Sequence, residues 1–371
     1  MMYLNKTLKL SLALLTLGAL NACSDTEFAK TDMSVQAYTV DVGQVDILFV
    51  VDNSGSMSTE QRRMANSFPN FVQGLDLAGL DYRIGIVTTD VSSQTRQLVD
   101  NGVLQNGNFL AFPNGDYYLT PKSTNIESEF WSTIQRQETL DCENSGYNSS
   151  LCPSDDERGI YAAYLAVDNN KKSFFRKNGH LAIIFLSDED VRGFGTSSEQ
   201  YPYRLPEALD YPENLLQVIE TRLGANTDVS AHAIVTDTES CKTAQMAQGG
   251  NSNIHGVIGN FYMAMTNPNN SSLISGTAGT TMGSYAGGQL VQGVVGSICS
   301  NDYVSELGSI KNVLSKTKSS ERLRCKLIDA SALDVRIDNA YSWSLSDSLD
   351  EITFSPALPP GESFKLDYEC P

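Results

Sequence analysis

Short, strongly apolar runs alternate with polar segments of helical periodicity over most of the chain. Val45–Val51 and Leu181–Leu186 are continuous apolar runs of the length expected for strands that are buried on both faces. Tyr82–Thr89, which is rich in strand-forming residues, and Asp228–Val235 are two further predicted strands. Because helical segments separate these strands, the pattern predicts an α/β fold with a doubly wound, mainly parallel sheet flanked by helices.

The predicted helices fall between these strands and after the last of them. Each shows helical spacing of apolar positions or a helix-start signal, such as the proline at the beginning of one segment. They are Ser58–Gln73, Ile126–Gln137, Glu157–Asp168, Pro212–Leu223, Gln289–Ile298 and Val304–Lys316. The pattern is interrupted at about 91–154 and 249–288, where Asn, Gly and Ser are frequent. We predict that these segments are long insertions in one α/β domain of residues 45–320.

The character of the sequence changes after Cys325. Short alternating strands are predicted at Leu333–Asp338, Glu351–Phe354 and Ser363–Tyr368, with Ser, Asp, Pro and Gly between them. Residues 326–371 are therefore expected to form a small β-unit, whose length is near the lower limit for an independently folding domain.

The N-terminus has the pattern of an export signal. Lys6 and Lys9 precede a short apolar stretch, Leu10–Leu20, which is too short to span a membrane. We predict that residues 1–22 are removed as a signal peptide and that residues 23–44 form a polar tether with one strand.

The end of this signal, Leu20-Asn21-Ala22-Cys23, resembles a bacterial lipobox. The resemblance implies that Cys23 becomes the lipidated first residue of the mature chain; the alternative is an ordinary signal peptide with a chance cysteine. Ser24 in the second position implies sorting to the outer membrane. The expected location is thus the bacterial cell envelope, with a lipid anchor.

The remaining cysteines and the charge fit an exported protein. Six cysteines remain without Cys23, and an even number in an exported chain suggests disulfides. We expect them to pair in order along the chain: Cys142, Cys152, Cys241, Cys299, Cys325 and Cys370. The formal net charge of −18 disfavours nucleic acid and anionic lipid heads as partners, so membrane contact should come from the lipid alone.

Candidate chemistry begins where the first apolar run ends. The stretch Asp52-Asn53-Ser54-Gly55-Ser56 places a carboxylate and two hydroxyls at alternate positions of a strand-to-helix loop. Open α/β sheets bind their ligands at such loops. Oxygen ligands of this kind suit a hard divalent cation, and Mg²⁺ in particular. A helix-capping loop is the alternative explanation of the same residues.

In this stretch the sequence resembles the von Willebrand factor A family, whose metal-ion-dependent adhesion site begins with D-x-S-x-S after the first strand. The family supplies a hydroxyl from a second loop, five residues before a Gly-Ile pair, and this position is Ser154 here. An aspartate after a buried strand completes the set, and Asp188 fits this position, with Glu189 where glycine is usual. The resemblance therefore implies Mg²⁺, or Mn²⁺ or Ca²⁺, held by Asp52, Ser54, Ser56, Ser154 and Asp188.

The resemblance also implies a function. In the family, a partner protein's Asp or Glu carboxylate completes the coordination of the metal, so we expect a surface-anchored binding or adhesion module. The alternative is an envelope assembly or scaffold lipoprotein in which the metal is structural. We expect no enzyme, because His180, His232 and His255 lack an accompanying nucleophile motif and the first two lie in or beside predicted strands.

Overall fold

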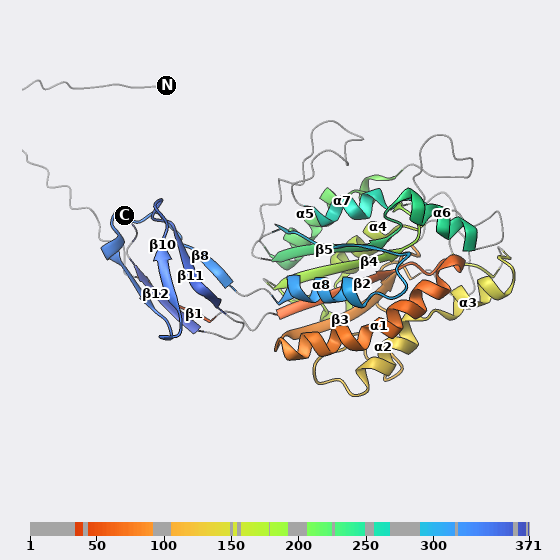
Figure 1. Cartoon of the computed structure of the whole chain (residues 1–371), viewed down its shortest axis with the longest axis horizontal. Coiled ribbons are helices and arrows are strands. Elements are labelled where there is room, and N and C mark those ends of the chain that lie inside the picture. Colours follow the sequence, from red (N-terminus) through yellow and green to blue (C-terminus); the bar gives the residue numbers. More distant parts are fainter. Residues whose placement is uncertain are drawn as a thin grey trace, which may run out of the picture.

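A computed structural model describes residues 34–39, 44–91, 105–148, 151–153, 157–177, 179–191, 206–224, 227–248, 256–267, 290–315, 318–358, 363–368 and 370. The centre of the molecule is a parallel sheet with the strand order β3-β2-β4-β5-β6, and β7 also pairs with β5 (Figure 1). The strands are β2 Gln44–Val51, β3 Asp81–Thr88, β4 His180–Ser187, β5 Asp228–Val235, β6 Leu290–Val291 and β7 Val295–Ser297. The predicted α/β class and mainly parallel sheet are confirmed.

Helices cover both faces of this sheet because its strands are apolar on both faces. Ile47 and Phe49 of β2 pack with the helices of one face, whereas Leu48 and Val50 pack with those of the other. The first face carries α1 Ser58–Leu77, α2 Ile126–Ile134 and α8 Val304–Leu314. The second face carries α4 Gly159–Asn169, α5 Pro212–Leu223 and α7 Asn260–Thr266. None of the described helices is both long and apolar enough to cross a lipid bilayer.

Two helices and several short turns lie outside these layers. Helix α3 spans Gln137–Asn144 and α6 spans Glu239–Gln248. Figure 1 shows both of them toward the end of the sheet where the strand arrows point. The 3₁₀ turns are η1 Gly55–Met57, η2 Lys171–Ser173, η4 Ala208–Asp210 and η6 Ala330–Ala332. Helices α2 and α3 show that part of the first predicted insertion is ordered as helix.

The helix predicted at 289–298 is wrong, because this segment forms β6 and β7 beside β5. Gly293 explains the difference, since a Cβ atom there would lie 1.7 Å from the carbonyl oxygen of Ala231. Gly296 is also packed closely, against Glu306. Glycine disfavours a helix by about 1 kcal/mol relative to alanine, so close approach to β5 determines the conformation here.

The C-terminal strands form two small sheets with a core of their own. The strands are β8 Lys318–Arg322, β9 Leu333–Arg336, β10 Ser342–Leu345, β11 Glu351–Leu358 and β12 Ser363–Tyr368. The first of the chain, β1 Ser34–Thr39, pairs antiparallel with β12, and Figure 1 shows it among the blue strands of this unit. The α/β region is therefore an insertion between β1 and β8, and its entry and exit lie at the same end of the sheet.

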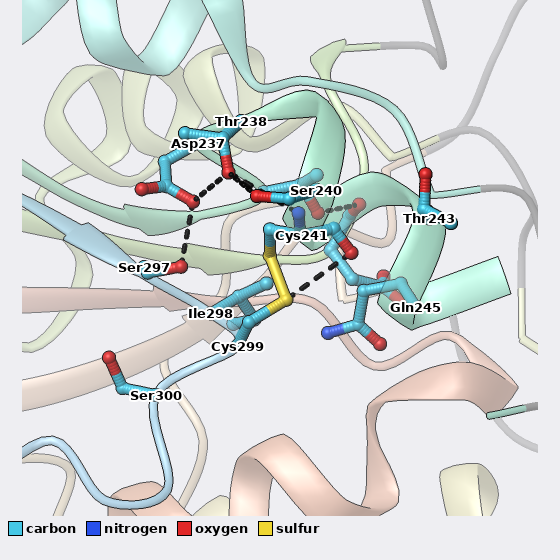
Figure 2. The surroundings of a disulfide bond; sticks show 12 residues. Asp237, Thr238, Ser240, Cys241, Thr243, Gln245, Ser297, Ile298, Cys299 and Ser300 are labelled. Atoms are coloured by element: carbon cyan, nitrogen blue, oxygen red, sulfur yellow. Dashed lines mark hydrogen bonds between the residues drawn. A yellow bond between two sulfur atoms is a disulfide. The ribbon is translucent and has the colours of Figure 1, made fainter. Parts of the chain in front are cut away.

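The disulfides pair in the predicted sequence order. The bridges are Cys142–Cys152, Cys241–Cys299 and Cys325–Cys370. Figure 2 shows the second bridge, which ties the first turn of α6 to the loop between β7 and α8. Beside it, the Ser297 hydroxyl donates a hydrogen bond to the Asp237 carboxylate at 2.7 Å. Helix α6 is thus covalently joined to the loop that follows β7.

Candidate metal-binding site

The predicted site residues lie where two neighbouring strands end. Strand β2 has β3 on one side and β4 on the other, with Val51 aligned to Leu186 across the latter pair. The loops that follow β2 and β4 start next to each other, at the point where the sheet changes its winding direction. Asp52 follows β2 and Asp188 follows β4 by one residue. Ligand sites of doubly wound sheets occur at this kind of position.

Asp52 is held in one orientation by its surroundings. It is fully buried, and its backbone N–H donates to the Leu186 carbonyl at 2.9 Å. One carboxylate oxygen accepts from the Ser54 backbone N–H at 2.8 Å. The other accepts from the Ser187 hydroxyl at 2.7 Å. The carboxylate therefore has few rotamers, which lowers the entropic cost of binding a ligand.

The two serines of the motif bring their hydroxyls together at the same place. The Ser54 and Ser56 Oγ atoms lie 3.1 Å apart, and both residues are half-buried. Ser56 also hydrogen-bonds the Asp188 carboxylate. Gly55 between them packs directly against Cys142 and Tyr147. The motif thus forms one compact group of oxygens with Asp188 rather than a row of exposed side chains.

Asp188 has one carboxylate oxygen whose bonding is incomplete. The residue is 1% exposed, and its Oδ1 atom has no hydrogen-bond partner among the described residues. Its main chain is fixed, because the carbonyl accepts from the Thr236 hydroxyl at 2.7 Å and from the Val257 N–H at 3.2 Å. A buried polar atom without a partner is costly. A cation would satisfy this oxygen, so the residues present fit a hard divalent metal.

Burial of two carboxylates at this edge raises the pKa of both. For Asp188 the causes are burial first, then the negative charges of Asp52 and Glu60. For Asp52 the main cause is burial, which the hydrogen bonds from Ser54 and Ser187 offset in part. Two like charges that are removed from water repel strongly. A bound divalent cation would reverse this balance and favour both ionised forms.

Glu60 is a site neighbour that the sequence reasoning missed. It lies in the first turn of α1, is 1% exposed, and accepts from Arg63 at 3.3 Å and Gln245 at 3.4 Å. Burial is the main cause of its raised pKa. Its position one helical turn after Ser56 was the available signal, because residues four apart share one face of a helix.

Helix α3 contacts the loop that carries Asp52 and Asn53. The Thr139 hydroxyl donates to the Asn53 carbonyl at 2.7 Å. The buried Gln61 amide donates to the Asp52 carbonyl at 2.9 Å and to Thr139 Oγ1 at 3.1 Å, and accepts from the Arg136 N–H at 3.0 Å. Two consecutive carbonyls of the motif are therefore bonded to the α1–α3 contact. Sequence periodicity alone gave no sign of this role for the insertion.

The structure brings together four of the five predicted metal ligands. Asp52, Ser54, Ser56 and Asp188 lie at one place, whereas Ser154 and the lipidation candidate Cys23 lie outside the described residues. Within the described residues there is no group of three or more His, Cys, Asp and Glu side chains arranged for a metal. The donor set is therefore two carboxylates with hydroxyls, which suits Mg²⁺ because this ion often retains several waters.

The histidines lie elsewhere. His180 and His232 both contact the Ser230 hydroxyl, at 2.8 and 3.0 Å. Ser230 is 1% exposed, His232 is fully buried, and burial lowers the pKa of His232 to about 3. His232 is a packed structural group, His180 is half-buried at the start of β4, and His255 lies outside the described residues.

No family model and no curated protein matches the sequence. Solved structures that match include the pilus adhesin SpaC from Lactobacillus rhamnosus GG in an open conformation (11% identity, 88% of this chain and 38% of that chain, TM-score 0.32). A second is proximal thread matrix protein 1 from the mussel byssus (14% identity, 76% of this chain and 48% of that chain, TM-score 0.32). A third is the pilus adhesin RrgA from Streptococcus pneumoniae (10% identity, 90% of this chain and 57% of that chain, TM-score 0.29). This chain spans 38% to 57% of those structures. Likeness at this level does not show what this chain binds.

Asp188→Asn should raise the stability of the metal-free protein and abolish its stabilisation by Mg²⁺. The pKa of Asp188 is raised above its ordinary 3.8, so the native carboxyl keeps its proton where the unfolded chain has lost it. Its contribution to stability is full at low pH and is lost as pH rises through the native pKa. In EDTA the free energy of unfolding of the variant should therefore rise relative to that of the wild type between pH 4 and 8. The difference should reach about 1–3 kcal/mol at pH 8. Denaturant unfolding at several pH values measures this gap.

Mg²⁺ should stabilise the wild type at pH 8 and leave Asp188→Asn unchanged. A gap that is constant with pH, or equal Mg²⁺ stabilisation of both proteins, would contradict the assignment.

Removal of the Cys142–Cys152 bridge should lower metal affinity more than global stability. The bridge closes a loop with a sequence separation of 10 and packs on Gly55, whereas the sheet core does not include it. In the chain-entropy picture such a loop contributes about 2–3 kcal/mol. Calorimetric Mg²⁺ affinity and melting temperature of Cys142→Ser/Cys152→Ser give the test. A melting temperature lowered by many degrees, together with normal Mg²⁺ affinity, would show that the bridge stabilises the fold and not the site.

Proposed function

We propose that the α/β region is a metal-dependent binding module of the von Willebrand factor A type. Asp52, Ser54, Ser56 and Asp188 would hold one divalent cation, with Ser154 as the fifth predicted ligand. The observation that carries the proposal is the buried Asp188 Oδ1 atom without a partner among the described residues, beside a second buried carboxylate and two converging hydroxyls. An ordinary capping loop does not explain this arrangement, because Ser54 and Met57 make no side-chain capping bond at η1 and α1.

The charges of the site favour a carboxylate-bearing partner. Asp52 and Asp188 together match the charge of a divalent cation, and the serine hydroxyls add oxygen donors without charge. When bound, such a cation would accept an anionic oxygen from outside the chain. Asp52 is fixed by Ser54 and Ser187, so this chain's ligands are preorganised before any partner arrives. The partner would be a protein segment that presents an Asp or Glu.

The module would be displayed on the bacterial envelope by a lipid on Cys23, with outer-membrane sorting directed by Ser24. The polar residues 24–33 would separate the anchor from β1. Metabolic labelling with a palmitate analogue should mark the wild type and not Cys23→Ser. Equal labelling of the two proteins would refute the lipid anchor.

We propose a binding role without catalysis. Support comes from the Ser230 hydroxyl with its two histidine contacts, which is buried inside the sheet where a substrate has no access. The carboxylates at the strand ends have raised pKa values, but burial and like charge explain these without a catalytic role.

Asp52→Ala tests the function. The variant should lose Mg²⁺ or Mn²⁺ binding in calorimetry while its circular dichroism spectrum stays native, and it should lose Mg²⁺-dependent capture of partners from envelope or target-cell extract. Asp347→Ala is a matched control, because this exposed carboxylate lies in the separate β-unit. Normal Mg²⁺ affinity in Asp52→Ala would contradict the assignment of Asp52 as a metal ligand. Capture that survives EDTA would favour the alternative, a scaffold protein with a structural metal.

A further inference from the structure

The segment that links β8 to β9 alternates buried and exposed side chains. Leu323 and Leu327 are buried in the core of the C-terminal β-unit, whereas Arg324, Lys326 and Ile328 are exposed. Ile328 is 78% exposed, which is unusual for a large apolar side chain. The outward side chains of the segment are thus two cations and an isoleucine.

This segment is fixed to the rest of the β-unit by covalent and hydrogen bonds. Cys325, between the two cations, forms a disulfide with Cys370. The Leu323 N–H donates to the Asp350 carbonyl at 2.8 Å, and the Leu327 N–H donates to a carbonyl between β10 and β11 at 2.9 Å. The fold, rather than any contact of the outward side chains, therefore determines where these side chains lie.

The chain that precedes β1 leaves the β-unit beside this segment. Strand β1 begins at Ser34, which is paired with Tyr368 of β12. The Tyr368 hydroxyl accepts from the Arg324 backbone N–H at 3.2 Å. Cys370, two residues after Tyr368, is bridged to Cys325. The start of β1 and the outward cations therefore belong to the same end of the β-unit.

The proposed lipid anchor is a short way along the chain from this point. Cys23 and Ser34 are separated by residues 24–33. A fully extended chain of this length reaches about 40 Å, and a flexible one has an average span of about 20 Å. An anchored chain would therefore keep this end of the β-unit close to the bilayer. Tethering of this kind raises the effective concentration of the headgroups and makes a weak contact sufficient.

The charge of this region is opposite to that of the whole chain. Residues 316–326 contain five basic residues and one acidic residue, in a chain whose formal net charge is −18. They are Lys316, Lys318, Arg322, Arg324 and Lys326, with Glu321 as the acid. The net charge predicts repulsion from anionic lipid heads, but salt screens each charge beyond about 8–10 Å. The local sign therefore decides the interaction at short range.

We propose that Arg324, Lys326 and Ile328 form a membrane-contact face, which rests on the anionic phosphate headgroups of the bilayer that holds the lipid anchor. The inference rests on the proposed anchor and specifies how the β-unit lies beside it. The two cations pair with headgroup phosphates, and Ile328 inserts among the headgroups. Each basic residue near an anionic surface favours contact about fivefold. This is too weak to recruit so acidic a chain from solution, so the face acts only on a tethered chain, whose orientation it sets.

The chain from residue 23 onward, coupled through Cys23 to a maleimide lipid, provides the test. Cys23 is the only cysteine outside the three disulfides, so coupling is specific. Vesicles of phosphatidylcholine with phosphatidylglycerol are compared with vesicles of phosphatidylcholine alone. Mass spectrometry gives the acetylation rates of Lys326 and of Lys122, an exposed lysine of the α/β region.

Lys326 should react about five- to twentyfold more slowly on the anionic vesicles than on the neutral ones, as two basic residues at the surface imply. Lys122 should react equally on both. The protection of Lys326 should vanish at 1 M salt, where the Debye length is about 3 Å.

Variants separate the face from the rest of the surface. Arg324→Glu should remove the protection of Lys326 and leave the melting temperature unchanged, because the Arg324 side chain is exposed. Arg62→Glu, the same charge change at an exposed position of α1, should keep the protection. Ile328→Ser should reduce the protection on anionic vesicles.

Equal reactivity of Lys326 on the two kinds of vesicle, equal protection of Lys122, or full protection in Arg324→Glu would overturn the inference. Chemical coupling through Cys23 does not require lipidation by the cell. These outcomes would therefore leave the proposed lipid anchor in place, and palmitate labelling tests that anchor separately.

Discussion

Two carboxylates buried side by side at the ends of adjacent parallel strands are the constraint on which this molecule depends. Asp52 and Asp188 are excluded from water, burial raises the pKa of both, and the negative charge of Asp52 raises the pKa of Asp188 further. The parallel pairing of β2 with β4 forces them together, because their loops leave the sheet at the same edge. A fold that places two acids there loses stability, because both carboxyl groups are removed from water and lie close together.

The rest of the edge is organised around keeping those acids in place. Gln61 and Thr139 bond consecutive carbonyls of the motif, and the Cys142 disulfide closes over its glycine. Thr139 and Cys142 belong to the insertion and Gln61 to α1, whereas Ser187 and Thr236, which bond Asp52 and Asp188 directly, lie at strand ends. The fold therefore bears the entropic cost of ordering these side chains.

The C-terminal β-unit lies at the amino ends of the strands of the central sheet. Strand β1 pairs with β12, and the α/β region enters at Gln44 and leaves after α8. Both connections lie at the amino ends of the strands, and Figure 1 shows the β-unit at the end of the sheet opposite to α3 and α6.

The sequence by itself determined the α/β class, the strands from β2 to β5 and the position of Asp52 and Asp188 at strand ends, because apolar runs and the polar residues that end them are local signals. It favoured pairing of the cysteines in order but did not fix it, since six cysteines allow fifteen connectivities. Tertiary structure alone decided what depends on contacts between distant segments. The close approach of Gly293 to β5 accompanies strands where the sequence predicted a helix, and β1 pairs with β12, which lies more than 300 residues away. Glu60 and α3 became part of the site only because packing brought them to the motif, since no periodicity encodes which surface a helix meets.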